Sequence, residues 1–361
     1  MICCVINGRF LAQPVTGVQR YAIEVVSALD SALDAEPGLR SKYSFEVLST
    51  RNGRGKAVWS HIPVRTVGRR TGHLWEQTEL PRYLHGRLLI GLANTGPIRV
   101  SRQIATIHDA SIRAAPAGYS LSFRLWYRFV IRNLGKAARR IVTDSHFSRD
   151  ELHRWFDIST GKITIIPLGA DHILRQPADY AVVDRRSLTE RPFVLTAGSL
   201  NPNKNLGALF ETAAQLNERG VDLLVAGGAN ERVFGSMNWA FPPNVRYLGY
   251  VSDAELRALY ERAICFVFPS MYEGFGLPPL EAMTCGCPVV TSNAASLPEV
   301  CGEAACYADP NDPQDIARRV MEIVSEAGAQ TRLRRLGKER AASYSWAETA
   351  RRWLQLIEEC D

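Results

Sequence analysis

Residues 268–288 read Phe-Pro-Ser-Met-Tyr-Glu-Gly-Phe-Gly-Leu-Pro-Pro-Leu-Glu-Ala-Met-Thr-Cys-Gly-Cys-Pro. The apolar run Cys265–Phe268 leads into this stretch and has the composition of a buried strand. Gly274 and Gly276 then mark a loop, and the two prolines that follow are typical of the first turn of a helix. The order strand, glycine loop, helix predicts a parallel α/β sheet in this part of the chain.

The same alternation of short apolar runs and helical patterns extends over the whole chain, which predicts α/β architecture throughout. The expected strands are Ile2–Ile6, Phe45–Leu48, Leu88–Ile90, Ile104–Ile107, Arg140–Thr143, Ile163–Ile166, Phe193–Ala197, Asp222–Ala226, Val245–Leu248, Cys265–Phe268 and Pro288–Thr291. The expected helices are Val18–Leu29, Leu121–Ala138, Asn205–Glu218, Asp253–Arg262, Leu280–Cys285, Pro313–Ser325 and Trp346–Glu359.

The polar stretch from about Asp171 to Arg191 interrupts this alternation and reads as a linker. The sequence therefore predicts two doubly wound, Rossmann-like domains, residues 1–172 and 190–345, facing across a cleft at the carboxyl ends of their strands. The last helix, about residues 346–361, is apolar on one side and is a candidate to pack back on the first domain.

Composition sets the broad class of the protein. The 361 residues are 46% hydrophobic and 22% charged, so each domain can bury a core, and the net charge of +6 is mild. Several of the eight cysteines lie in apolar runs, as expected for reduced thiols in the cytoplasm. No apolar run is long enough to span a membrane, and no signal peptide is expected at the N-terminus.

Two carboxylates flank the glycine loop of residues 268–288. Glu273 lies on the loop, and Glu281 is expected in the first turn of the next helix. The backbone amides of Gly274, Phe275, Gly276 and Leu277, together with the start of that helix, suit an anion. A ligand with phosphates and hydroxyls would match this pattern, although each glutamate alone could be a solvated or helix-stabilising acid.

Three stretches of the second half resemble the family 4 retaining glycosyltransferases of GT-B fold. They are Tyr-Glu-Gly-Phe-Gly-Leu-Pro with Glu273-x7-Glu281, Met-x-Cys-Gly-x-Pro-Val-Val-x-Ser, and Leu297-Pro-Glu-Val300. The sequence of these motifs is similar to that of bacterial mannosyltransferases of surface-polysaccharide assembly. The resemblance covers the second half and, more loosely, the first. It implies that the first domain binds the acceptor and the second the nucleotide sugar. It also implies that Glu281 binds the nucleotide ribose and that Glu273 contacts the donor sugar.

A second candidate element follows the strand Phe193–Ala197, where Lys204 is expected at the start of a helix. A cation there is unfavourable to the helix dipole, so a role in neutralising the leaving diphosphate is favoured over a solvated lysine. In the resembling family a basic residue usually accompanies this lysine, but Ser199 stands in its place. Arg20, or backbone amides alone, would have to substitute.

Further candidates come from the resemblance. The turn after Val245–Leu248 would hold the base against Tyr250 and Val251, with a purely structural turn as the alternative. Gly17 would allow a close approach in the first glycine loop. His108 ends a strand and would contact the sugar or the acceptor. We expect His108, Glu273 and Lys204 to be the catalytic residues.

A basic stripe recurs every four residues in the helix expected at Leu121–Ala138. It consists of Arg124, Arg128, Arg132 and Lys136. Nine basic residues and one acid lie between Arg99 and Arg140. Such a helix either rests on anionic lipid, with a lipid-linked acceptor nearby, or packs its apolar face on the sheet.

Other functions fit less well. A nicotinamide dehydrogenase needs Gly-x-Gly-x-x-Gly after the first strand, which residues 7–17 lack. A glycoside hydrolase needs two opposed carboxylates. A sugar-nucleotide epimerase or phosphorylase and a non-catalytic binding module stay open.

No Asp-x-Asp is present, so neither metal nor other cofactor is expected. GDP-mannose is the expected donor, with UDP-glucose or another UDP-sugar as the alternative, and a glycan or lipid-linked oligosaccharide is the expected acceptor; no nucleic-acid partner is expected.

Overall fold

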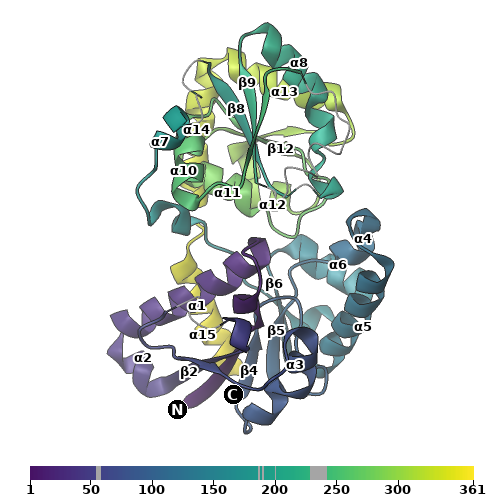
Figure 1. Cartoon of the computed structure of the whole chain (residues 1–361), viewed down its shortest axis with the longest axis vertical. Coiled ribbons are helices and arrows are strands. Elements are labelled where there is room, and N and C mark those ends of the chain that lie inside the picture. The colour runs from purple at the N-terminus through teal and green to yellow at the C-terminus, as the bar shows by residue number, and fades with distance from the viewer. Residues whose placement is uncertain (54–57, 186–187, 189–190, 200, 228–241) are drawn as a thin grey trace. The chain divides into compact units, whose positions relative to one another are not determined.

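The computed structural model describes residues 1–361 except 54–57, 186–187, 189–190, 200 and 228–241. The described chain divides into two compact units, residues 1–169 with 346–361, and residues 170–345. Each unit contains one parallel sheet with helices packed on it (Figure 1). The protein therefore has two Rossmann-like, doubly wound units.

The first unit is built on a seven-stranded sheet in the order β3-β2-β1-β4-β5-β6-β7. β1 lies between β2 and β4 and pairs in parallel with both. Because both faces are covered, the central strands are almost continuously buried. The strands are β1 Ile2–Asn7, β2 Tyr43–Ser49, β3 Val64–Thr66, β4 Leu88–Gly91, β5 Gln103–Thr106, β6 Arg140–Thr143 and β7 Ile163–Ile165.

The helices of the first unit include the last helix of the chain. α15 packs on α1, where the Nε1–H of Trp353 donates to the hydroxyl oxygen of Tyr21 over 3.2 Å, and both rings are fully buried. The α-helices are α1 Gly17–Ala35, α2 Pro37–Lys42, α3 Gly72–Thr78, α4 Ser111–Ala114, α5 Leu121–Ala137, α6 His146–Phe156 and α15 Trp346–Cys360. The 3-10 helices are η1 Gly8–Ala12, η2 Arg51–Gly53, η3 Leu80–Tyr83, η4 Pro116–Gly118 and η5 Thr160–Lys162.

The second unit has a six-stranded parallel sheet in the order β10-β9-β8-β11-β12-β13. In it α8 packs against α13, and α11 packs against α14 (Figure 1). The strands are β8 Phe193–Ala197, β9 Asp222–Ala226, β10 Val245–Gly249, β11 Phe266–Phe268, β12 Val289–Ser292 and β13 Ala305–Ala308. The helices are η6 Asp171–Leu174, α7 Ala181–Arg185, η7 Pro202–Lys204, η8 Leu206–Leu209, α8 Phe210–Glu218, α10 Asp253–Arg262, α11 Leu277–Thr284, α12 Leu297–Cys301, η9 Gly302–Ala304, α13 Pro313–Ser325 and α14 Ala327–Ala341.

The expected strands are confirmed with their ends within two residues, but the sequence missed several elements, among them β3, β13 and α14. β3 is a three-residue edge strand that is half polar, and β13 is only partly buried. α14 buries only a narrow stripe, Leu333, Gly337 and Ala341, because most of its residues are polar. Such elements carry too little apolar periodicity to stand out in a sequence.

The segment expected to be a linker is part of the second unit instead. Residues 170–190 belong to the second unit, where the described part forms η6 and α7. Both pack against α10. His172 is almost fully buried in this segment, so its polar composition does not reflect a solvated connection.

Candidate functional site

The second sheet reverses its winding between β8 and β11, which lie side by side while β9 and β10 extend from the other edge of β8. In open α/β sheets ligands bind beyond the carboxyl ends of the strands at such a reversal. The chain that leaves β8 carries Lys204, and the chain that leaves β11 carries Glu273. The topology therefore brings these two predicted residues to one place.

The local structure around Lys204 differs in detail from the expected helix start. Asn201 caps the short helix η7, and Lys204 is its last residue. Asn205 then takes a left-handed conformation (φ 55°), and α8 begins only at Phe210. Helical structure resumes at Leu206 in η8, which runs directly into α8, so Lys204 lies just before a helix start, as expected.

What singles out Lys204 is its contact with Glu273. The Nζ of Lys204 lies 2.6 Å from Oε1 of Glu273 and 5.0 Å from the ring centroid of Phe268. The hydroxyl of Ser270 donates to the same carboxylate oxygen. Both charged side chains are partly exposed, so the pair is accessible to a ligand.

The loop that carries Glu273 is fixed at several points. The amide of Met271 donates to the carbonyl of Asn203 over 2.8 Å, which ties the loop to η7. The hydroxyl of Ser296 lies 2.9 Å from the carbonyl oxygen of Glu273. Gly276 has a φ of +112°, and a Cβ there would lie 2.7 Å from Cδ2 of Leu297. Only glycine fits this position without strain.

This loop leads directly into α11, as the prolines predicted, although the helix begins earlier than expected, at Leu277. Gly274, Phe275 and Gly276 are buried, and the Phe275 ring packs edge-on against Tyr344. In the described part of the chain, the amides of Phe275, Gly276 and Leu277 make no hydrogen bond. These N–H groups at a helix start remain available to an anion.

Glu281 lies in the second turn of α11, not in the first turn as expected. Its Oε1 is 3.0 Å from Nε2 of His172, and the Tyr260 hydroxyl is 3.5 Å from Oε2. The Glu281 and His172 side chains are buried. A simple favourable effect on the helix dipole therefore does not account for this carboxylate.

The remaining candidates of the second unit lie at the ends of β8 and β10. Ser199 is exposed beyond β8, where the resemblance implied a basic residue. Tyr250 is 72% exposed after β10, whereas Val251 is buried. Ser252 and Glu255 form a capping box at the start of α10, with 2.8 Å from the Ser252 amide to the Glu255 carboxylate.

Gly17, Arg20 and His108 belong to the first unit. Gly17 opens α1, and a Cβ there would meet nothing within 4 Å, so the chain itself does not require glycine. An arginine nitrogen of Arg20 is 3.9 Å from the Glu24 carboxylate one turn along α1. Neither residue shows, by its own contacts, why it would bind phosphate.

His108 is buried just beyond β5 with acceptors at both ring nitrogens. Nδ1 lies 2.7 Å from Oδ2 of Asp144, and Nε2 lies 3.3 Å from the carbonyl oxygen of Leu92. Burial works to lower the pKa of His108, but attraction and hydrogen bonding to Asp144 outweigh it and raise the pKa. The contact to Leu92 is long for an N–H···O bond, so a ligand hydroxyl could replace the Leu92 carbonyl as the partner of Nε2.

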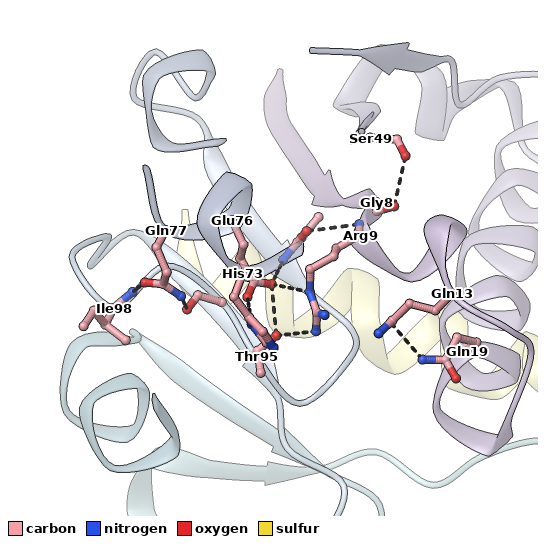
Figure 2. A network of polar contacts seen from close by, with 12 residues as sticks. Gly8, Arg9, Gln13, Gln19, Ser49, His73, Glu76, Gln77, Thr95 and Ile98 are labelled. Atoms are coloured by element: carbon pink, nitrogen blue, oxygen red, sulfur yellow. Dashed lines mark hydrogen bonds and ion pairs between the residues drawn. The ribbon is translucent and has the colours of Figure 1, made fainter. Parts of the chain in front are cut away.

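A hydrogen-bond network that the sequence did not reveal lies just beyond the carboxyl ends of β1 and β4 (Figure 2). Oε1 of Glu76 accepts from Nδ2 of Asn7 (2.7 Å), Nε of Arg9 (3.1 Å) and the hydroxyl of Thr95 (3.0 Å). Nδ1 of His73 lies 3.2 Å from Oε2. The members lie up to 88 residues apart, Asn7 to Thr95, which leaves no local signal.

Comparisons with known proteins identify the class. The family model "Glycosyl transferases group 1" matches residues 183–340, and "Glycosyltransferase Family 4" matches residues 80–173. The O-antigen chain mannosyltransferase B of Escherichia coli is 32% identical over 365 residues, which cover 92% of this chain and 93% of that protein. The chain belongs to the family 4 glycosyltransferases. This family 4 glycosyltransferase is a hexosyltransferase.

Solved structures confirm the GT-B fold of this family 4 glycosyltransferase. The sucrose-phosphate synthase of Thermosynechococcus elongatus has a TM-score of 0.76 at 19% identity and matches 99% of each chain. HepE of Anabaena, solved in complex with UDP and glucose, has a TM-score of 0.76 at 15% identity and matches 99% of this chain and 100% of that chain. At such identities the likeness concerns the fold.

Three properties of the described residues complete the picture of this glycosyltransferase. Over the ranges that the structure describes, no helix is both long and apolar enough to cross a membrane. No group of three or more His, Cys, Asp or Glu side chains among them is placed to hold a metal ion. All eight cysteines are free thiols, and burial raises the pKa of Cys4 to about 12.

Proposed function

We propose that this enzyme is a retaining mannosyltransferase that moves mannose from GDP-mannose to a glycan or lipid-linked oligosaccharide in polysaccharide biosynthesis. The pairing of Lys204 with Glu273 beside the amides of residues 275–277 carries the proposal. The mannosyl part is supported by the Escherichia coli relative, which is a mannosyltransferase of the O-antigen chain by name.

The pair can serve both ends of a nucleotide sugar. A lysine ammonium has three N–H donors, so Lys204 can keep its contact with Glu273 and still donate to the diphosphate. Oε2 of Glu273 makes no hydrogen bond within the described part of the chain and can accept a sugar hydroxyl. The free amides at the start of α11 add neutral donors for phosphate oxygens.

The buried pair of Glu281 and His172 suits the ribose. A hydroxyl of the ribose can replace the weak Tyr260 contact at Oε2 of Glu281, which spans 3.5 Å. His172 would hold the carboxylate in place through Oε1. The base would extend toward the end of β10, where the exposed ring of Tyr250 offers a flat surface.

The proposed chemistry follows from the leaving group. The bond between the anomeric carbon and the diphosphate oxygen breaks, and the acceptor oxygen forms its bond on the same face. The acceptor proton passes to an oxygen of the departing diphosphate. Lys204 and the α11 amides stabilise the negative charge that develops there. The product keeps the anomeric configuration of the donor.

The experiment offers the full chain a panel of GDP-mannose, GDP-fucose, UDP-glucose and UDP-galactose with a mannose-terminated oligosaccharide. Mass spectrometry detects transfer, and proton NMR gives the configuration of the new linkage. We expect product from GDP-mannose alone, with an α-linkage. Transfer from a UDP-hexose would replace the donor assignment, and a β-linkage would contradict retention.

We further propose that α5 brings the enzyme to an anionic membrane. Leu121, Leu125 and Phe129 form one row of the helix and are 67%, 57% and 50% exposed. The expectation that this apolar face packs on the sheet holds only for the second half of α5, where Val130, Ile131, Leu134 and Gly135 are buried. Arg124, Arg128, Arg132 and Lys136 form the adjacent row, and no acid lies within residues 110–143. Exposed apolar residues beside a basic row suit a helix lying in a lipid interface.

Vesicle sedimentation tests this contact. Three Arg→Gln changes at Arg124, Arg128 and Arg132 should weaken binding to phosphatidylglycerol vesicles by up to about 100-fold, at about 1 kcal/mol for each charge. A matched set at Arg318, Arg332 and Arg335, which are exposed on α13 and α14, should bind like the unchanged enzyme. Equal loss in both sets would reduce the effect to net charge and refute the role of α5.

A further inference from the structure

A separate pocket opens in the first unit where its sheet reverses its winding, between β1 and β4. Its volume is about 300 Å³, the space of roughly ten water molecules and the scale of a single sugar ring. Residues that follow β1, β4 and β5 line it on one side, and α5 lines it on the other. All residues that line the pocket belong to the first unit, whereas Lys204 and Glu273 belong to the second.

One lining residue, Arg9, belongs to a charge-balanced network (Figure 2). Arg9 reaches the pocket but is only 5% exposed, and its Nε is paired with Glu76, which is fully buried. Nη2 of Arg9 donates to the hydroxyl of Thr95 over 2.6 Å. Burial works to raise the pKa of Glu76, but Arg9, His73 and Asn7 outweigh it and lower the pKa. The arginine charge is therefore already neutralised and does not call for a phosphate.

Three polar side chains on the pocket wall have an atom to spare. Oδ1 of Asp109 accepts from the amide of Ser111 over 2.8 Å, whereas Oδ2 makes no hydrogen bond among the described residues. Asn94 uses its Oδ1 for the amide of His108 over 2.8 Å, and Gln13 uses its Oε1 for Gln19 over 3.0 Å. Their amide nitrogens have no partner in the described structure. The wall thus presents two N–H₂ donors and one carboxylate oxygen.

The opposite wall is aromatic. The rings of Tyr119 and Phe123 stack with centroids 5.4 Å apart and planes at 5°, and those of Phe123 and Tyr127 stack at 4.1 Å and 23°. All three rings line the pocket. A pyranose has an apolar C–H face and a rim of hydroxyls, so it can stack on such a wall while its rim meets polar groups.

We propose that this pocket binds the terminal sugar ring of the acceptor and selects a neutral sugar over a phosphorylated or uronic one. The proposal rests on the proposed function and names the class of its second substrate. Gln13 and Asn94 donate to ring hydroxyls, Oδ2 of Asp109 accepts from one, and the aromatic wall packs on the ring. An anionic sugar would meet the carboxylate of Asp109 with no unpaired cation in the described lining to offset it.

Direct binding tests the pocket without transfer. Saturation-transfer NMR and calorimetry with a mannose-terminated disaccharide, at saturating GDP, should show binding to the full chain. Asp109→Asn and Gln13→Ala should each weaken it about tenfold, the effect of one lost hydrogen bond to a ligand hydroxyl. Asp150→Asn removes an exposed charge from α6 of the same unit and should bind normally. Normal binding by both pocket variants would overturn the assignment.

Two further readouts separate the possible failures. In transfer assays the KM for the acceptor should rise about tenfold in both pocket variants, whereas the KM for the donor should stay within about twofold. A disaccharide ending in a hexuronate should bind the unchanged enzyme at least tenfold more weakly than the neutral one, and Asp109→Asn should narrow that gap. An unchanged gap would overturn the selection for neutral sugars. If the saccharide binds as predicted but GDP-mannose supports no transfer, the proposed donor is wrong and the pocket assignment stands.

Discussion

The most demanding stability test is the removal of one charge from the buried network of the first unit. Glu76 is fully buried, and its Oε1 accepts hydrogen bonds from Asn7, Arg9 and Thr95 at 2.7, 3.1 and 3.0 Å. Glu76→Gln keeps the shape of the side chain but removes the charge and turns an acceptor into a donor. Arg9, 5% exposed, would then carry an uncompensated charge.

Breaking a buried ion pair on one side costs about 3–5 kcal/mol, because the remaining charge has lost its solvent and its partner. The opening equilibrium of the first unit should therefore rise by roughly 10²–10⁴, at about 1.4 kcal/mol for each factor of ten. Glu358→Gln removes an equivalent charge from an exposed pair with Lys42 in the same unit. This control should leave the opening equilibrium of the first unit unchanged, because solvent screens the exposed pair.

Hydrogen exchange of β1 measures the effect where it is expected and avoids treating two units as one transition. The pKa of Glu76 is lowered, so its contribution is present above the unfolded pKa, near 4.5, and is lost as the pH falls through the folded pKa. The stability of the first unit should therefore depend less on pH below 4.5 in Glu76→Gln than in the unchanged protein. The double variant Arg9→Met with Glu76→Leu should cost less than Glu76→Gln alone. A change below about 1 kcal/mol in Glu76→Gln would refute the reasoning.

The other predictions concern the loop and the buried histidine. Gly276→Ala should destabilise the second unit by about 1–3 kcal/mol, because its φ is +112° and the new Cβ would meet Leu297 at 2.7 Å; an unchanged melting temperature would contradict this. The pKa of His108 is raised, so its contribution to stability is present below its unfolded pKa, near 6.5, and is lost as the pH rises through the folded pKa. Hydrogen exchange of β5 between pH 6 and 9 should show this loss, and His108→Gln should flatten it; an equal slope in both proteins would contradict the His108 assignment.

The fold could be predicted from the sequence because the central strands are buried on both faces and read as continuous apolar runs. The reversal points of both sheets follow from strand order, which the sequence does not state. Glu273 and its loop were predictable from local composition. The place of Lys204 beside a helix start was predictable, but its contact with Glu273 was not.

The parts that could not be predicted depend on contacts between distant residues. His172 fell in a segment taken for a linker, and its contact with Glu281 joins residues 109 positions apart. Arg9 lies two residues beyond β1, and its burial could not be predicted because its partner Glu76 lies on α3, a helix that no pattern marked. Hydrophobic periodicity locates elements but says nothing of which polar side chains meet between them.

The central claim is that Lys204 and Glu273 hold the diphosphate and sugar of GDP-mannose, and calorimetric titration of GDP-mannose tests it most directly. The unchanged enzyme should bind, whereas Lys204→Met and Glu273→Gln should each weaken binding about tenfold or more, the effect of losing one charge-assisted hydrogen bond. Lys42→Met, an exposed lysine of the first unit, is the matched control and should bind normally. Normal binding of GDP-mannose by Lys204→Met and Glu273→Gln would contradict the account.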